Sequence, residues 1–402
     1  MRIMFVLGFV LPFPGAAWTR ISFFARKWSQ RGHVVDVVGT FSFKALKEKG
    51  IKKIEGINVF NIIFNIGVKT EHPLIVTLNN TLSLLILLFH LLIRRPKVVI
   101  ISVPAGGHMQ IGAIIACKLM QVRYIIDFRD EWEDYVYGRA SKNFYKKMYK
   151  LLKRVMTALY EKSDLVVTVT QPIAGSLTLR GVRRVKIVPN GADVTVFKPY
   201  DKAAVRRRLR VKDEEFIIVY EGTVGEYYRL DVVIKALARL DNAVRNKIRL
   251  LVVGSGDMPN LLKLAENFGL KDNVLYLGAK NDKVELAQII SAGDVGVIPY
   301  DDNPLWKNSV PAKFYEYCAC GIPVIATVYD DSLLASIIKE GEVGLTTPPL
   351  DEEELSKAIL WFYHNAELRE VMGRRARMLV EEKFDRNKIA DEFFKLVLRM
   401  CN

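Results

Sequence analysis

The sequence predicts an α/β protein of two domains, each with a parallel sheet that helices cover on both faces. The chain has 402 residues, which is too long for one ordinary hydrophobic core and suits two domains. Short runs of apolar and β-branched residues alternate with stretches of helical periodicity along the whole chain. Strands that read as continuous apolar runs, separated by helices, are typical of parallel sheets buried on both sides.

The predicted strands fall into two sets, one in each half of the chain. The turn sequence Pro-Asn-Gly-Ala-Asp at 189–193 separates the sets and supplies the residues that a hinge needs. In the first half, strands are predicted at 3–7, 34–38, 98–102, 124–128, 165–168 and 186–188. In the second half, they are predicted at 216–220, 249–253, 274–276, 295–298, 323–326 and 344–346.

The N-terminal residues and the cysteines favour a cytoplasmic protein. Residues 1–8 form a short apolar run that prolines soon follow, which favours a buried strand over a secretory signal. The cysteines, at 117, 318, 320 and 401, show no spacing typical of a zinc site or a disulfide framework. A reducing cytosol fits this use of cysteine.

Positive charge is concentrated in the first half of the chain. Of the net charge of +15, residues 1–200 contribute +18, from 30 Lys and Arg against 12 Asp and Glu. Residues 201–402 contribute −3, from 29 against 32. This imbalance predicts that the first half meets an anionic surface, which could be nucleic acid, anionic lipid or a phosphorylated acceptor. A solvated basic face without a partner is the alternative.

A helix predicted over 142–155 places basic and apolar residues on opposite sides. The basic sector, about 140° wide at 100° per residue, holds Lys142, Lys146, Lys147, Lys150, Lys153 and Arg154. The apolar side, which can pack on the core, holds Phe144, Tyr145, Met148, Leu151, Leu152 and Val155. The basic sector predicts reversible binding to an anionic leaflet, which would hold the protein at the inner face of the cell membrane.

Residues 74–93 form a strongly apolar stretch, interrupted by threonines, asparagines, a serine and a histidine. A membrane-spanning helix needs about twenty predominantly apolar residues. The interruptions therefore predict a buried helix, with shallow insertion into a leaflet as the alternative.

Two glycine-bearing segments follow predicted strands of the second half. The first is Tyr-Glu-Gly-Thr-Val-Gly at 220–225, and the second is Val-Gly-Ser-Gly-Asp at 253–257. Glycines let a backbone approach a ligand closely, and the helix that follows each segment favours an anion at its N-terminus. Ligands of open α/β sheets bind at the carboxyl ends of the strands. A tight turn between strand and helix is the alternative for both segments.

The segment 308–323 predicts a short helix with a charged face. Ser309 can cap the helix, and Gly321 with Pro323 can end it. Lys313 and Glu316 are three residues apart and so share a face near its N-terminus. There a lysine can meet phosphate oxygens and a glutamate can accept the hydroxyls of a ribose. A surface ion pair on a core helix is the alternative.

Taken in order, these motifs resemble those of the retaining, family-four (glycosyltransferase group 1) type of glycosyltransferase. The resemblance covers nearly the whole chain and rests on residues 12–16, 31–35, 189–193, 222–225, 254–256 and 311–323. It implies the GT-B fold, in which two Rossmann-like domains face each other across a deep cleft. The expected acceptor-side domain is 1–192 together with about 386–402, a C-terminal helix that crosses back. The expected donor-binding domain is 193–385.

The resemblance also implies a donor site for a nucleotide-diphosphate sugar, of the UDP or GDP type. The residues expected to hold it are Gly15, Gly222, Thr223, Gly225, Arg229, Gly254, Gly256, Asn308, Lys313 and Glu316. No further cofactor is expected. No metal is expected either, because no carboxylate cluster has the spacing of a metal site.

The chain departs from the family pattern at several positions. The family often has a glutamate where this chain has Asn308, and an arginine and a lysine where it has Thr223 and Tyr228. Arg229 and Lys313 are then the nearest cations for the diphosphate. The family's cleft histidine has no counterpart in Asp-Phe-Arg-Asp-Glu-Trp at 127–132. A related branch carries such a sequence there, so Asp127, Arg129 and Asp130, with Lys313, are the candidate catalytic residues. Buried charges that satisfy one another are the alternative for the first three.

The resemblance therefore implies transfer of a sugar, with retention at the anomeric carbon, to a lipid-linked or cell-surface glycan precursor. An epimerase-like enzyme on the same fold is the alternative within the enzyme class. A nucleic-acid-binding protein is the alternative outside it. Strands that are apolar on both faces argue against nucleic acid, because such proteins present aromatic and basic residues on an exposed sheet.

Overall fold

The computed structural model describes two compact units of the chain. Unit 1 comprises Met1–Pro189 with Lys388–Asn402, and unit 2 comprises Asn190–Asn387. These limits lie close to the predicted boundaries at 192 and 385. The described residues are 1–8, 16–41, 51–54, 56–64, 73–104, 110–131, 133–134, 143–225 and 227–401.

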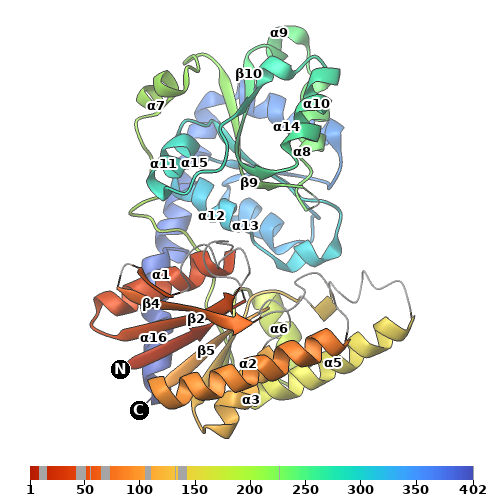
Figure 1. Ribbon diagram of the computed structural model, residues 1–402. Coiled ribbons are helices and arrows are strands. Elements are labelled where there is room, and N and C mark those ends of the chain that lie inside the picture. Colours follow the sequence, from red (N-terminus) through yellow and green to blue (C-terminus); the bar gives the residue numbers. More distant parts are fainter. Residues whose placement is uncertain are drawn as a thin grey trace. The chain divides into compact units, whose positions relative to one another are not determined.

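Unit 1 is an α/β layer structure around an eight-stranded sheet in its described part, with the order β3-β4-β2-β1-β5-β6-β7-β8 (Figure 1). Its strands are β1 (Arg2–Val6), β2 (Val34–Phe41), β3 (Ile51–Ile54), β4 (Ile57–Phe64), β5 (Val98–Val103), β6 (Arg123–Phe128), β7 (Leu165–Thr168) and β8 (Val185–Ile187). Its helices are α1 (Ala16–Gln30), α2 (Pro73–Arg94), α3 (Gln110–Leu119), α5 (Asn143–Glu161), α6 (Gln171–Leu179) and α16 (Arg386–Cys401). Every residue of β5 is buried, as the continuous apolar run predicts.

Unit 2 repeats the scheme around a six-stranded parallel sheet in its described residues, with the order β11-β10-β9-β12-β13-β14. Its strands are β9 (Phe216–Val224), β10 (Ile248–Gly256), β11 (Val274–Tyr276), β12 (Val295–Pro299), β13 (Val324–Thr327) and β14 (Gly344–Thr347). Its longer helices are α7 (Lys202–Leu209), α8 (Leu230–Ala238), α10 (Met258–Asn267), α11 (Lys283–Ser291), α12 (Ala312–Ala319), α13 (Leu333–Gly341), α14 (Glu352–His364) and α15 (Ala366–Lys383). Short helical turns lie at α9 (Asn242–Arg245), η3 (Lys271–Asn273) and η4 (Pro304–Asn308).

The C-terminal helix α16 packs on α1 within unit 1, in agreement with the expected return of the chain. The indole Nε1 of Trp28 donates to the carbonyl of Ala390 over 3.2 Å. The Phe393 ring meets the rings of Phe24 and Trp28 edge-on, with centroids 5.4 and 5.3 Å away. Aromatic contacts of this kind add to the stabilisation from buried apolar area, so α16 is an integral layer of unit 1.

Strands β3 and β4 were not predicted from the sequence, and β3 runs antiparallel to β4. They form a hairpin that extends the sheet of unit 1 beyond β2. Gly56 turns the chain between them with a φ of 86°, a conformation that glycine adopts without strain. The expectation of parallel strands alone is therefore wrong at this edge of the sheet.

Helix α2 is not the buried helix that the sequence predicts. Of its apolar window Thr77–Arg94, whose mean hydropathy of 1.4 and length would suffice to cross a membrane, only 28% is buried. The buried side carries polar residues among leucines: Asn79, Ser83, His90, Leu87 and Leu91. The exposed side carries a stripe of large apolar residues: Leu74, Leu78, Leu85, Phe89, Leu92 and Ile93. A helix that faces water normally has its apolar residues on the buried side and its polar residues on the exposed side, and α2 shows the reverse.

Helix α5 also exposes part of its predicted core side. Tyr149, Met156 and Tyr160 are buried, whereas Phe144, Leu151 and Val155 are exposed. In the basic sector, Lys147, Lys150 and Arg154 are exposed, but Lys153 is tied to Asp134 over 2.5 Å. Lys142 lies outside the described residues. The outer side of α5 therefore combines an apolar stripe with adjacent cations, rather than a purely basic face.

Candidate functional site

The centre of the candidate site is the N-terminal turn of α12, which follows β12 and η4 in unit 2. Lys313 and Glu316 share a face of this helix, as their spacing predicts, but only 4% and 3% of their surfaces are exposed. This burial excludes the alternative of a surface ion pair. Pro311, rather than Ser309, is the capping residue, and no side chain caps the helix. The first backbone N–H groups of α12 therefore keep their capacity to bind an anion.

The Lys313 ammonium is held between two aromatic rings. Its Nζ lies 3.4 Å from the ring centroid of Tyr228 and 4.0 Å from that of Tyr220. It makes no hydrogen bond to any described residue. Burial lowers the pKa of Lys313 to about 7, although the nearby carboxyls of Glu221 and Glu316 oppose this shift. A buried cation that π faces hold without an acceptor is prepared to receive an anionic ligand.

The segment around Gly222 lies directly above this cation. A β-carbon at Gly222 would come within 3.1 Å of the Lys313 Nζ, and the φ of Gly222 is 122°. A side chain at position 222 would therefore both strain the backbone and cover the ammonium. The geometry brings Gly222, Lys313 and Glu316 together, as the resemblance implies.

Glu221 is a further site residue, which the sequence did not single out. A hydrogen bond joins its carboxyl to that of Glu316, and burial, followed by the charge of Glu316, raises the pKa of Glu221. Two adjacent carboxyls cannot both ionise easily, so one proton holds the pair together. The backbone N–H of Glu221 donates to the Tyr317 hydroxyl over 2.8 Å. Glu221 could have been identified from the sequence, because it lies immediately before Gly222 and directly after a predicted buried strand.

The sequence suggested a separate loop at each glycine-bearing segment, but the structure has paired strands there. Strands β9 and β10 continue through them side by side, with Gly254 opposite Gly222 and Gly256 opposite Val224. A β-carbon at Gly254 would collide with the carbonyl of Gly222, and one at Gly256 with that of Val224. Gly254 and Gly256 are thus required by the close approach of two backbones. The expected place of Gly254 and Gly256 at the donor site stays a prediction.

Arg229 is not a free cation for a diphosphate. Its guanidinium makes two hydrogen bonds of 2.8 Å to the carboxylate of Asp231, at the start of α8. Gly225, Tyr228 and Arg229 line a hollow of about 480 Å³ between α8 and α10. The Thr223 carbonyl accepts the Tyr220 hydroxyl over 2.5 Å, and Asn308 ends η4, half-buried. Of the two cations predicted for the diphosphate, Arg229 is paired with a carboxylate, whereas Lys313 has no hydrogen bond within the described part of the chain.

The candidate residues of unit 1 have three different environments. Asp127 is fully buried and forms an ion pair with Arg20, whose Nη2 lies 3.2 Å from the Asp127 Oδ1. Arg129 donates to the Ser102 hydroxyl over 3.0 Å, whereas Asp130 is exposed to solvent. Gly15 lies outside the described residues. The geometry thus favours the alternative of a mutually satisfied buried charge for Asp127. The Asp130 side chain reaches solvent, yet its surroundings desolvate the carboxyl enough to raise its pKa.

Two family models match the chain. The model described as "Glycosyltransferase Family 4" matches residues 17–196, and that described as "Glycosyl transferases group 1" matches residues 201–378. The chain belongs to the glycosyltransferase group 1 and family 4 superfamily. The two matches meet between the predicted domains, and the second contains Glu221, Lys313 and Glu316.

Solved structures share the fold of this glycosyltransferase family member over almost its whole length. Sucrose-phosphate synthase from Thermosynechococcus elongatus aligns with a TM-score of 0.78 at 18% identity, over 99% of this chain and 98% of that one. Anabaena HepE in complex with UDP aligns with a TM-score of 0.72 at 17% identity, over 99% and 100%. The two parallel-sheet domains are therefore those of the GT-B fold.

Curated relatives of this glycosyltransferase family member match over shorter stretches. D-inositol 3-phosphate glycosyltransferase from Segniliparus rotundus is 32% identical over 42% of this chain and 38% of that protein. N-acetyl-alpha-D-glucosaminyl L-malate synthase from Bacillus anthracis is 26% identical over 58% and 59%. The chain thus spans less than two thirds of the length of these relatives.

Proposed function

We propose that this protein transfers a sugar from a nucleotide-diphosphate sugar to a glycan acceptor, with retention at the anomeric carbon. The observation that carries the proposal is the buried Lys313 ammonium, which makes no hydrogen bond to a described residue and lies beneath Gly222 beside Glu316. The HepE structures with UDP and with UDP-glucose show that a protein of this fold binds such a donor. Product analysis with a labelled donor distinguishes transfer from an epimerase-like reaction.

In the proposed reaction the protein binds and orients the donor and stabilises the leaving group. Negative charge grows on the diphosphate as the bond to the sugar breaks, and Lys313 with the first N–H groups of α12 would offset it. The Glu316 carboxylate would accept the hydroxyls of the ribose. No further cofactor is needed. Among the described residues, no group of His, Cys, Asp and Glu side chains could hold a metal ion.

Replacing Glu316 with alanine is expected to weaken UDP binding by about 1–3 kcal/mol, the cost of leaving buried polar partners unpaired. Titration calorimetry with UDP and GDP measures the loss and identifies the preferred base. Glu340→Ala, at an exposed position of α13, is the matched control and should bind like the wild type. Unchanged affinity in a folded Glu316→Ala variant would rule out the ribose contact.

The acceptor that we propose is a lipid-linked or cell-surface glycan precursor, reached at the inner face of the cell membrane. The exposed apolar stripe of α2 and the outer side of α5 both belong to unit 1, and α3 packs against both helices. Exposed cations flank the α5 stripe at Lys147, Lys150 and Arg154. Apolar residues beside cations are what an anionic leaflet binds, by shallow insertion and charge attraction together.

Liposome flotation tests this membrane contact. Wild type is expected to float with anionic vesicles, more strongly at low salt, because about 1 kcal/mol per cation near the surface is screened by salt. Leu85→Glu with Phe89→Glu should abolish flotation, and Lys147→Glu with Lys150→Glu and Arg154→Glu should remove its salt-sensitive part. Leu368→Glu, on an exposed apolar residue of α15, is the control. The lipid-linked acceptor loses its support if wild type ignores the vesicles.

A small soluble acceptor is the second candidate, because two relatives are named for inositol phosphate and malate as acceptors. An enzyme that does not bind vesicles and glycosylates a water-soluble acceptor would establish this candidate instead.

A further inference from the structure

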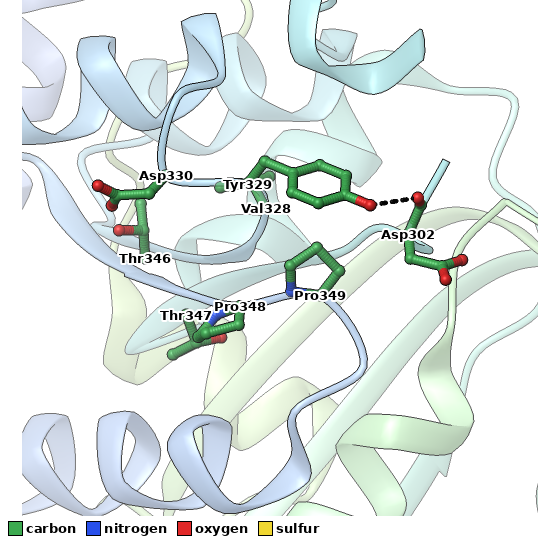
Figure 2. A pocket seen from close by; sticks show the side chains of 8 residues that line it. All are labelled: Asp302, Val328, Tyr329, Asp330, Thr346, Thr347, Pro348 and Pro349. Carbon is green, nitrogen blue, oxygen red and sulfur yellow. Dashed lines mark hydrogen bonds between the residues drawn. The ribbon is translucent and has the colours of Figure 1, made fainter. Parts of the chain in front are cut away.

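A second hollow lies in unit 2, and neither Lys313 nor Glu316 lines it. It has a volume of about 410 Å³ and opens at the carboxyl ends of β12, β13 and β14 (Figure 2). Asp302, Tyr329, Asp330, Thr346 and Pro349 line it, each from the segment that follows or ends one of these strands. Its volume falls within the range of about 300–1,000 Å³ that is usual for small-molecule sites. None of the residues assigned to the donor lines it.

The apolar wall of this hollow is a fixed aromatic ring with prolines beside it. The Tyr329 hydroxyl donates to the carbonyl of Asp302 over 2.6 Å, which ties the segment after β13 to that after β12. Figure 2 shows Pro349 and the Tyr329 ring on the same hollow. The ammonium of Lys307 lies 4.6 Å from the Tyr329 ring centroid and 2.7 Å from Asp331. The ring is therefore positioned before any ligand arrives.

The polar wall of the hollow carries carboxylates and hydroxyls but neither Lys nor Arg among its lining residues. Asp330 is paired with Lys339, whereas the Asp302 carboxylate is exposed and lies close enough to Arg229 for its charge to help raise the pKa of that guanidinium. Thr347, also in the wall, is buried, and its hydroxyl has no hydrogen-bond partner in the part of the chain that the structure describes. These groups repel phosphates and accept hydrogen bonds from uncharged hydroxyls.

We propose that this hollow is a carbohydrate subsite that binds a neutral sugar residue of a glycan. An aromatic ring beside pyrrolidine rings can pack against the C–H face of a pyranose, while carboxylates and threonine hydroxyls bind its hydroxyl groups. The lack of a lining cation separates this subsite from the donor site, whose ligand is an anion. The subsite depends on the proposed function in one respect, namely that a glycan is a substrate of the protein.

Saturation-transfer NMR on the full chain tests the subsite, with the methyl glycosides of glucose, galactose, mannose and N-acetylglucosamine as probes. At least one neutral probe is expected to receive saturation, and its 6-phosphate counterpart should bind more weakly. Tyr329→Ala should reduce the signal of that probe about fivefold, the effect of one aromatic contact. The matched control is Phe268→Ala, which removes an exposed ring at the end of α10. Tyr329→Ala should leave UDP affinity unchanged, which shows that the fold and the donor site are intact.

Binding of no neutral probe, or binding that Tyr329→Ala leaves unchanged, would overturn the subsite. If Tyr329→Ala also loses UDP binding, Asp302→Lys decides the matter, because a lysine there should reverse the preference and favour the 6-phosphate. An unreversed preference then refutes the subsite. If wild type does not bind UDP, the proposed donor site is refuted but the subsite is not, because binding of the neutral probes is measured separately.

Discussion

Replacing Lys313 with methionine is expected to lower kcat about 100- to 1,000-fold, the usual loss when one stabilising donor is removed from a developing oxyanion. Methionine fills the space between Tyr220 and Tyr228 without a charge, so the fold should persist. Burial of the Lys313 ammonium costs more than the nearby carboxyls of Glu221 and Glu316 return, so its removal should not lower the melting temperature. Steady-state kinetics with a labelled nucleotide sugar, beside a thermal melt, measure both effects.

A second readout of Lys313 is proton uptake on nucleotide binding. In the free protein the pKa of Lys313 is about 7, and a bound diphosphate raises it, because the anion favours the ammonium. UDP binding above pH 7 should therefore take up protons, and the affinity should fall as the pH rises from 7 to 8. Calorimetry in buffers of different ionisation enthalpy measures the uptake, which Lys313→Met should abolish.

The pKa of Glu221 is also raised, so this carboxyl could take up a proton on UDP binding as well. Comparison of the variants shows which of the two residues binds the proton. Lys271→Met, at an exposed lysine paired with Glu266, is the control for loss of positive charge and should behave as wild type. A Lys313→Met variant with unchanged turnover and unchanged proton uptake would contradict the role that we assign to this residue.

Replacing Asp127 with alanine is expected to destabilise unit 1 by about 3–5 kcal/mol, the cost of leaving one partner of a buried ion pair alone. Arg20 would keep its hydrogen bonds to the carbonyls of Val188 and Pro189, of 2.7 and 2.9 Å. It would still lose the ion pair with the buried Asp127 carboxylate. A lower melting temperature and faster hydrogen exchange in β6 measure the effect.

Asp130→Ala is the matched comparison, because Asp130 is exposed and its removal should change stability by no more than about 0.5 kcal/mol. If Asp130 contacts the acceptor, this variant loses activity at an unchanged melting temperature. Should Asp127→Ala instead melt like wild type and lose activity, the result would support a catalytic role for Asp127.

The sheets were largely predictable because buried parallel strands read as continuous apolar runs. Each predicted strand has its counterpart, from β1 and β2 in unit 1 to β13 and β14 in unit 2. The hairpin of β3 and β4 was missed because it has no helix between its strands. The exposed apolar side of α2 was missed because hydropathy reports how apolar a helix is. Which side of the helix is buried depends on its tertiary contacts. One such contact is the 3.0 Å hydrogen bond from the Gly112 N–H to Asn80.

The candidate site was predictable where helical spacing decides geometry. Lys313 and Glu316 share a face because residues three apart on a helix are neighbours. Their burial was not predictable, nor was the contact of Lys313 with Tyr220 and Tyr228, since both depend on how β9 and α12 pack. The strand conformation of the β10 glycines was not predictable, because glycine content alone does not distinguish a loop from two backbones in close register.

The close register of β9 and β10 has a consequence for protein engineering. Whether or not residue 254 touches a donor, any side chain there would collide with the Gly222 carbonyl and so displace the segment next to the Lys313 ammonium. Libraries that aim to change donor preference should therefore keep positions 222, 254 and 256 as glycine. Diversity is better placed at Thr223, whose side chain is exposed and lies opposite Ser255 in the strand register.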